Sequence, residues 1–251
     1  MIVCHYNDPH LSHAVNSLKN QSKKTDIVLV DDGSAQQFKH FYKNVKIINL
    51  IQNRGIGHAR SVGINYTLNR RFNFIGFLDS DGIAHPRFIE KAIQYLENNK
   101  NILGVSARKD VANPKSRIAL VKYHYKIYKE DNFQLDCSLF RTEAIKGRTM
   151  PDRIVGEDSV FIGSFSEGAL RKLNLPYYHF EREDIRSFFR DEFYGAYYSF
   201  KSNPMRITKQ FLATPFSSLK MILVKRWVLE GVLFPLRQLI WLCGYLMGQN
   251  Y

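Results

Sequence analysis

The sequence predicts an α/β fold in which a mostly parallel, Rossmann-like sheet is flanked by helices. Short apolar runs that suit buried strands alternate with longer segments that suit helices over the first 105 residues. Acidic residues end two of these runs, at Val28–Ser34 and Phe77–Gly82. The carboxyl ends of parallel strands are where open α/β sheets bind ligands, so both acidic segments are candidates for a binding site.

The elements of the first half follow in a regular order. We expect strands at 2–5, 26–30, 46–50 and 74–78, and helices at 11–20, 57–68 and 86–98. This spacing is typical of strand–helix–strand units, which place parallel strands side by side.

The pattern loosens after residue 105. Residues 108–129 carry many cations and tyrosines, which predicts a loop or a β-rich region. A strand at 133–140, a helix at 157–173 and a last strand at 176–180 follow. Glu157 and Asp158 would lie in the first turn of that helix, where the helix dipole favours acidic residues.

The charge balance of the chain implies an anionic partner. Its 251 residues include 36 Lys and Arg against 23 Asp and Glu, a net charge of +13. Nucleic acid, a membrane surface or a phosphorylated substrate would each fit. No helix-turn-helix, zinc-finger or RNP pattern is present, so we expect no nucleic-acid partner. Three widely spaced cysteines and the absence of a signal-peptide pattern predict a reducing, cytoplasmic location.

Residues 204–251 differ in composition and predict an amphipathic helical tail. Their longest uncharged run is shorter than the roughly 20 apolar residues that a membrane-spanning helix needs. At helical spacing Arg226, Glu230 and Arg237 share one face, which favours a helix lying in an anionic membrane interface and bent at Pro235. The alternative is a helix pair packed on the rest of the chain or on another copy in a homo-oligomer.

Four motifs occur in a fixed order. They are Asp31–Ser34 (DDGS), Asn53–Arg60, Asp79–Asp81 (DSD) and the pair Glu157–Asp158. Over residues 1–190 their order and spacing resemble the family 2 glycosyltransferases of the GT-A fold. The resemblance implies a catalytic domain at 1–203, with a nucleotide-binding half at 1–105 and an acceptor-binding half at 106–203.

The resemblance implies an inverting transfer of sugar from a nucleoside-diphosphate sugar to a hydroxyl of a glycan or lipid-linked acceptor. Charge builds on the leaving diphosphate, and oxygen ligands suit Mn²⁺ or Mg²⁺ for neutralising it. Asp81 would then be the metal ligand. Asp79 would hold the ribose of the donor or assist the metal, and Ser80 would contact the donor. His179 could bind the metal or a phosphate. The alternatives are a capped turn at Asp79–Asp81 and a structural histidine.

Three further residues would contact the donor nucleotide. By resemblance, Asp32 accepts a hydrogen bond from the base, Tyr6 stacks on the base, and Arg60 projects toward the nucleotide. Asp31 would support the turn instead. Cys4–His5 replaces the Pro-Thr that the family often carries, which leaves the other contacts of that loop open.

Asp158 would be the general base that takes the proton from the attacking hydroxyl, and Glu157 would orient the acceptor. The plain alternative is a charge pair that stabilises a helix start. Two other functions remain open. A sugar nucleotidyltransferase would carry a glycine-rich basic loop where Tyr6–Pro9 stands, and a non-catalytic binder of nucleotide sugars or nucleic acid would not need both Asp81 and Asp158. The charge and the tail favour a lipid-linked acceptor and a peripheral position on the inner face of the membrane.

Overall fold

The computed structural model describes residues 1–35, 42–129, 133–152, 156–198, 218 and 228–248. The chain divides into two compact units. The first comprises Met1–Ala112 and Asn132–Phe180, and the second comprises Asn113–Asp131 and Glu181–Tyr251. The expected boundary at residue 203 lies outside the described residues, and the segments before it are shared between the two units.

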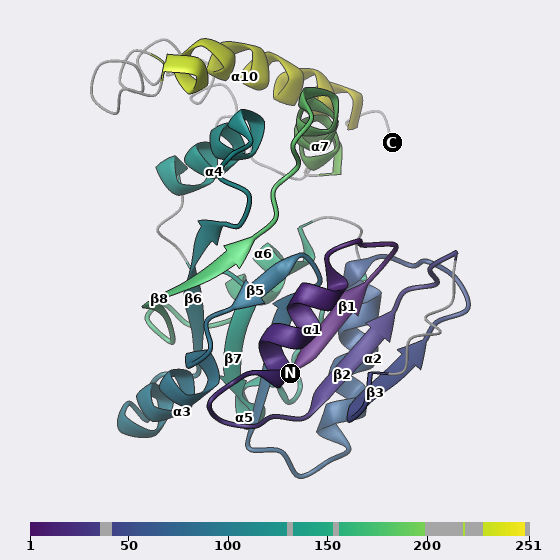
Figure 1. Ribbon diagram of the computed structural model, residues 1–251, viewed down its shortest axis with the longest axis vertical. Helices are drawn as coiled ribbons and strands as arrows, with labels where there is room; N and C mark the ends of the chain where they lie inside the picture. Colours follow the sequence, from purple (N-terminus) through teal and green to yellow (C-terminus); the bar gives the residue numbers. More distant parts are fainter. Residues whose placement is uncertain (36–41, 130–132, 153–155, 199–217, 219–227, 249–251) are drawn as a thin grey trace. The chain divides into compact units, whose positions relative to one another are not determined.

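A mixed sheet organises the first unit (Figure 1). Its described strands run in the order β3-β2-β1-β4-β7-β6-β8-β5. Strands β1 to β4 pair in parallel, whereas β7 is antiparallel to both β4 and β6. The strands are β1 (Ile2–His5), β2 (Ile27–Asp31), β3 (Val45–Asn49), β4 (Phe74–Asp79), β5 (Gly82–Ala84), β6 (Gly104–Val111), β7 (Cys137–Arg141) and β8 (Leu170–His179).

Helices cover both faces of this sheet and create two hydrophobic cores. Val3 and Leu29 enter the core beneath α1 and α3, whereas Ile2, Val28 and Phe77 enter the core beneath α2, α5 and α6. Alternate residues of a strand point to opposite faces, so strands covered on both sides are apolar throughout. The helices are α1 (Leu11–Lys19), α2 (Ile56–Leu68), α3 (Phe88–Asn98), α5 (Thr142–Ile145) and α6 (Glu157–Gly163). The predicted α/β fold, with a central sheet flanked by helices, is confirmed.

Strand pairing brings two distant segments to the carboxyl end of β4. After Asp79 the chain turns into β5, in which Gly82 pairs with His179 of β8. The backbone N–H of Phe180 donates to the carbonyl of Asp81 at 2.9 Å, and that of Asp79 donates to the carbonyl of Asp136 at 2.9 Å. The two aspartates of the DSD motif therefore lie beside residues 57 or more positions later in the chain.

Two predictions for the second half of the chain are wrong. Residues 117–129 form the helix α4 (Arg117–Lys129), because Val121 and Tyr125 recur at helical spacing and are buried together. The helix expected at 157–173 ends at Gly163, and β8 begins at Leu170. Between them Gly168 takes a φ of +79°, a left-handed conformation that favours glycine and forms part of the turn before β8.

The described part of the second unit is helical. It contains α4, α7 (Ile185–Tyr198) and α10 (Val228–Gly248), and α10 packs against α7 (Figure 1). Helix α10 continues through Pro235. Of the helices that the structure describes, none has the length and apolar character to cross a membrane. Arg226 of the predicted tail lies outside the described residues.

Candidate functional site

A buried arginine links three elements of the first unit. Arg60 of α2 is only 3% exposed. Its Nη1 donates to Oε1 of Glu157 at 2.5 Å, and its Nη2 donates to Oδ1 of Asp79 at 2.7 Å. Arg60 is therefore not a solvated helix cation. The guanidinium holds the start of α6 against the end of β4, and its contact with a nucleotide stays a prediction.

The electrostatics of this cluster follow from burial and close charges. Burial alone would lower the pKa of Arg60, but Asp79 and Glu157 raise it above its ordinary value. Burial and the nearby Asp136 raise the pKa of Asp79 to about 7, against the opposing effect of Arg60, although 21% of its side-chain surface is exposed. Burial also raises the pKa of Glu157. A cation bound nearby would favour the ionised form of these carboxylates.

Removing the guanidinium is expected to destabilise the fold. Arg60→Ala would leave Glu157 and Asp79 without their buried partner, which typically costs about 3–5 kcal/mol. Urea denaturation measures the loss. Arg71→Ala is the control, because Arg71 is exposed. Equal urea midpoints for the two variants would show that Arg60 does not hold the cluster together.

The DSD motif and His179 form a group that could hold a metal. Oδ1 of Asp81 lies 3.1 Å from Nε2 of His179. Burial would raise the pKa of Asp81, but His179 lowers it below its ordinary value. Candidate ligand atoms of Asp79, Asp136 and His179 also lie within 4.8 Å of one another. Three carboxylates and an imidazole thus gather at one edge of the sheet.

One member of this cluster, Asp136, was not predicted from the sequence. Oδ2 of Asp136 accepts hydrogen bonds from Nζ of Lys109 at 2.7 Å and from the hydroxyl of Tyr177 at 3.4 Å. Asp136 lies within the run 133–140 that was predicted as a strand, in which apolar and polar residues alternate up to Leu139. An acidic side chain in such a run needs a partner when it is buried, and this was the signal available in the sequence.

The DDGS motif forms a tight turn beside the Asn53–Arg60 segment. Asp31 supports the turn as expected, because its Oδ1 accepts from the backbone N–H of Ser34 at 3.1 Å and from the Ser34 hydroxyl at 2.5 Å. Gly33 has a φ of +74°, and a Cβ there would lie 2.5 Å from the carbonyl carbon of Gln52. Only glycine fits this turn without a shift of the backbone.

Asp32, which is predicted to accept a hydrogen bond from the nucleotide base, accepts hydrogen bonds from the backbone in this structure. Its Oδ1 accepts from the N–H of Arg54 at 3.0 Å, and its Oδ2 accepts from the N–H of Gly55 at 2.8 Å. These bonds tie the end of β2 to the loop that starts α2. A carboxylate oxygen can accept more than one hydrogen bond, so recognition of a base by Asp32 stays a prediction.

The remaining predicted donor contacts lie at the ends of β1 and β4. Tyr6 is 51% exposed. The hydroxyl of Ser80 donates to Oδ2 of Asp8 at 3.0 Å, a partner that was not predicted. Exposure leaves Tyr6 a surface for stacking, and Asp8 fixes the direction of the Ser80 hydroxyl.

The acidic pair begins α6, with its two side chains in different surroundings. Gly156 precedes it with a φ of +80°. Glu157 is buried against Arg60, whereas Asp158 is half-buried and its Oδ1 accepts from the backbone N–H of Ser159 at 2.7 Å. Adjacent residues of a helix point about 100° apart, so Glu157 anchors the helix while the side chain of Asp158 points in another direction.

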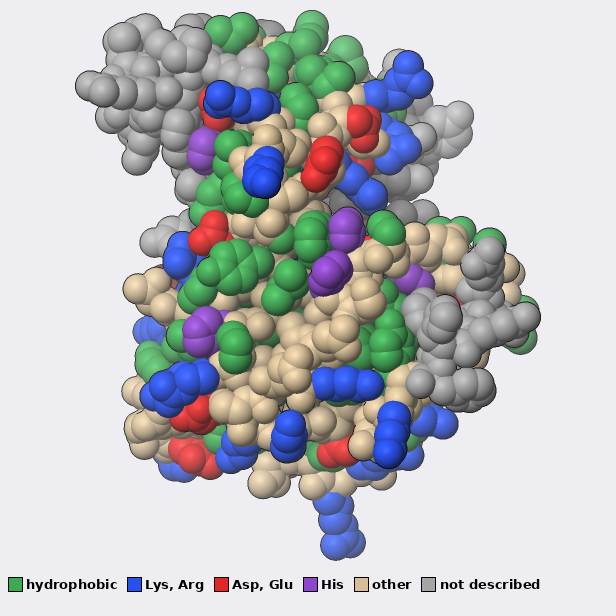
Figure 2. Space-filling view, in the orientation of Figure 1, with side chains coloured by type: hydrophobic (Ala, Val, Ile, Leu, Met, Phe, Trp, Pro, Cys, Tyr) green, Lys and Arg blue, Asp and Glu red, His purple; other side chains and the backbone are tan. Residues whose placement is uncertain are grey.

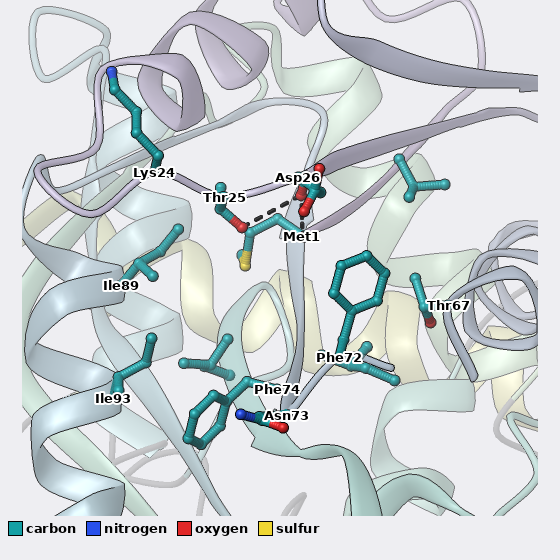
Figure 3. Close-up of a pocket in the computed structure, with 13 residues that line it drawn as sticks. Met1, Lys24, Thr25, Asp26, Thr67, Phe72, Asn73, Phe74, Ile89 and Ile93 are labelled. Atoms are coloured by element: carbon teal, nitrogen blue, oxygen red, sulfur yellow. Dashed lines mark hydrogen bonds between the residues drawn. The ribbon is translucent and has the colours of Figure 1, made fainter. Parts of the chain in front are cut away.

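A cavity of about 180 Å³ lies at the other end of the parallel strands (Figure 3). Met1, Asp26 and Phe74, at or next to the starts of β1, β2 and β4, line it together with Ile89 and Ile93 of α3. None of the predicted site residues, all of which the structure describes, lines this cavity. Its lining holds one carboxylate and no imidazole, so it lacks the groups that gather at the end of β4.

Comparison with known proteins assigns the family. The model of the family described as Glycosyl transferase family 2 matches residues 1–154. The chain belongs to glycosyl transferase family 2. The predicted family, and with it the prediction of a glycosyltransferase domain, is confirmed.

Curated relatives are similar to this chain in sequence, and solved structures share its fold. The chain is 28% identical over 116 residues to an uncharacterized glycosyltransferase of Haemophilus influenzae, a match that covers 43% of this chain and 35% of that protein. It is 29% identical over 114 residues to the minor teichoic acid biosynthesis protein GgaA of Bacillus subtilis, covering 41% of this chain and 25% of GgaA. Residues 1–349 of TarS from S. aureus, solved with UDP-GlcNAc, share the fold with a TM-score of 0.57 and 19% identity, covering 99% of this chain and 89% of that one. The chain thus spans about a third or less of the length of these two curated relatives.

Proposed function

We propose that this chain transfers a sugar from a nucleoside-diphosphate donor to a hydroxyl of a glycan or lipid-linked acceptor, and that a divalent cation assists. The observation that carries the proposal is the cluster of Asp79, Asp81, Asp136 and His179 at the end of β4 in a chain of this family. The solved complex of TarS with UDP-GlcNAc supports a nucleotide-sugar donor for this fold.

The donor set fits a divalent metal. Carboxylate oxygens suit Mg²⁺ and Mn²⁺, and an imidazole adds a ligand that suits Mn²⁺. Burial and the nearby carboxylate of Asp136 raise the pKa of Asp79, and a bound cation would oppose both effects. Asp81 and His179 would hold the ion, and Asp79 or Asp136 would complete its protein ligands. When bound, the ion would neutralise charge on the departing diphosphate.

The residues around the cluster would have separate roles in the transfer. Asp158 takes the proton from the acceptor hydroxyl as that oxygen attacks the anomeric carbon. Attack opposite the leaving diphosphate inverts the configuration at that carbon. Arg60 anchors Glu157 and so positions the first turn of α6, which carries Asp158. Asp32 and Tyr6 contact the base, and Ser80, oriented by Asp8, contacts the donor.

The acceptor that best suits the chain carries negative charge. A net charge of +13 favours a phosphate-bearing glycan or a lipid-linked diphosphate over a neutral one. GgaA acts in minor teichoic acid biosynthesis by its name, which supports a cell-surface polysaccharide as the product class. Synthesis on a lipid carrier would hold the enzyme at the inner face of the membrane.

A thermal-shift screen tests the proposed donor. UDP-, GDP- and dTDP-sugars are added to the full chain with and without Mn²⁺. A donor present at a hundredfold its Kd stabilises the folded state by about 2.7 kcal/mol, which raises the melting temperature by several degrees. We expect one base class to do so, and only with the metal. If no nucleotide sugar raises the melting temperature under either condition, the proposed function is wrong.

A further inference from the structure

The charged residues of α10 face other helices of the second unit. Oε1 of Glu230 contacts Nδ1 of His124 on α4, and Nη2 of Arg237 lies 2.7 Å from Oε2 of Glu192 on α7. Gln238 is buried as well. Glu230 and Arg237 share one face as predicted, but that face packs inward against α4 and α7.

The outward face of α10 is apolar. Val232 is 62% exposed, Leu236 43% and Leu239 48%, and Cys243 is exposed too. Steps of four, three and four residues put these side chains in one stripe along the helix. Figure 2 shows apolar side chains gathered on the outer side of α10. A helix on a water-exposed surface normally has the opposite arrangement, with its polar face outward.

The part of the sequence that precedes this stripe is strongly basic. Residues 193–229 contain six Lys and Arg and no Asp or Glu, namely Lys201, Arg206, Lys209, Lys220, Lys225 and Arg226. An apolar helix face beside a basic segment is the combination that binds anionic membrane surfaces. The same charge disfavours a second copy as the occupant, because two identical basic segments would repel each other.

We infer that the outer face of α10, formed by Val232, Leu236, Leu239 and Cys243, seats on the surface of an anionic lipid bilayer. This deepens the proposed function, since a lipid-linked acceptor would be presented at that surface. The helix lies on the membrane rather than crossing it, because its inward face carries the ion-paired Glu230 and Arg237. Membrane binding itself needs no sugar transfer, so the two proposals can fail separately.

Cys243 provides a direct probe of this surface. It is exposed, whereas Cys4 and Cys137 are buried. The environment-sensitive fluorophore NBD, attached to Cys243 of the full chain, should shift to the blue on vesicles of equal phosphatidylglycerol and phosphatidylcholine. Spin-labelled lipids in those vesicles should quench it. Vesicles of phosphatidylcholine alone should give a much weaker response.

A pair of matched variants completes the test. Leu236→Glu should weaken binding to the anionic vesicles at least about tenfold, because a charge placed in the stripe must be desolvated. Ile51→Glu makes the same charge change at an exposed position of the first unit and should bind within about twofold of the unchanged chain. Melting curves of both variants, with and without donor, confirm folding and report the donor site separately.

Two results would overturn the inference. One is equal vesicle binding by Leu236→Glu and the unchanged chain, or no binding by either. The other is an NBD shift that needs no vesicles and grows with protein concentration, together with sedimentation as a dimer, which would assign the stripe to a second copy. A donor-dependent melting shift that persists in either case would leave the proposed transferase function intact.

Discussion

Asp158→Asn is expected to slow sugar transfer by about 10²–10⁴-fold, the usual contribution of a general base. Asparagine keeps the size of the side chain and can still accept a hydrogen bond from Ser159, but it cannot take a proton. Donor affinity should change little, because the buried contact to Arg60 is made by Glu157. Initial rates of nucleoside-diphosphate release at saturating donor measure the effect.

Glu167→Gln is the matched control for this variant. Glu167 is exposed in the turn after α6, so the same loss of charge near the same helix should leave the rate unchanged within about twofold. Donor affinity is measured in parallel by the melting shift. If Asp158→Asn keeps a rate within a few-fold of the unchanged chain, another group must accept the proton.

Asp81→Ala is expected to abolish metal-dependent nucleotide binding. The change removes the carboxylate that lies 3.1 Å from His179, and so removes one of the proposed protein ligands. Losing even an outer-shell partner of a metal typically costs about 10–100-fold in affinity, so loss of a ligand should cost at least as much. Isothermal titration with UDP, GDP and dTDP, with and without Mn²⁺, measures the loss.

Asp110→Ala separates this effect from a general loss of negative charge. Asp110 lies on β6 of the same unit and pairs with Arg108 rather than with the metal cluster. This control should keep Mn²⁺-dependent binding within about twofold. If Asp81→Ala binds nucleotide with unchanged Mn²⁺ dependence, the ion is held elsewhere.

Local patterns predicted the framework of the first unit well. Apolar runs that alternate with helical segments placed β1 to β4 and α1 to α3 within a few residues. The DSD motif was predicted at a strand end, and β4 does end at Asp79. These features depend on neighbours along the chain, which a sequence displays directly.

The parts that could not be predicted depend on pairing between distant segments. Asp136 reaches Asp79 only because β7 pairs antiparallel with β4, and Lys109 reaches Asp136 only through β6. The burial of Arg60 between two carboxylates likewise needs α6 to return to β4. Partners separated by 19 to 97 positions leave no local signal in one sequence.

The helices of the second unit show what the helical spacing of charged and apolar residues cannot predict. The spacing of Glu230 and Arg237 on α10 identified a charged face, but not the direction in which that face points. Their partners, His124 and Glu192, come from other helices and turn the face inward. The tyrosines and lysines of α4 suggested a loop or a β-rich region, because cations between aromatic residues concealed the buried pair Val121 and Tyr125.

A crystal structure of the chain with Mn²⁺ and the donor selected by the melting shift tests the central claim most directly. Anomalous scattering locates the ion without reference to the protein model. We expect an anomalous peak in contact with Asp81 and His179, the diphosphate bound to the ion, and the anomeric carbon facing Asp158. A donor bound away from the end of β4, or bound there with its anomeric carbon turned away from Asp158, would contradict that claim.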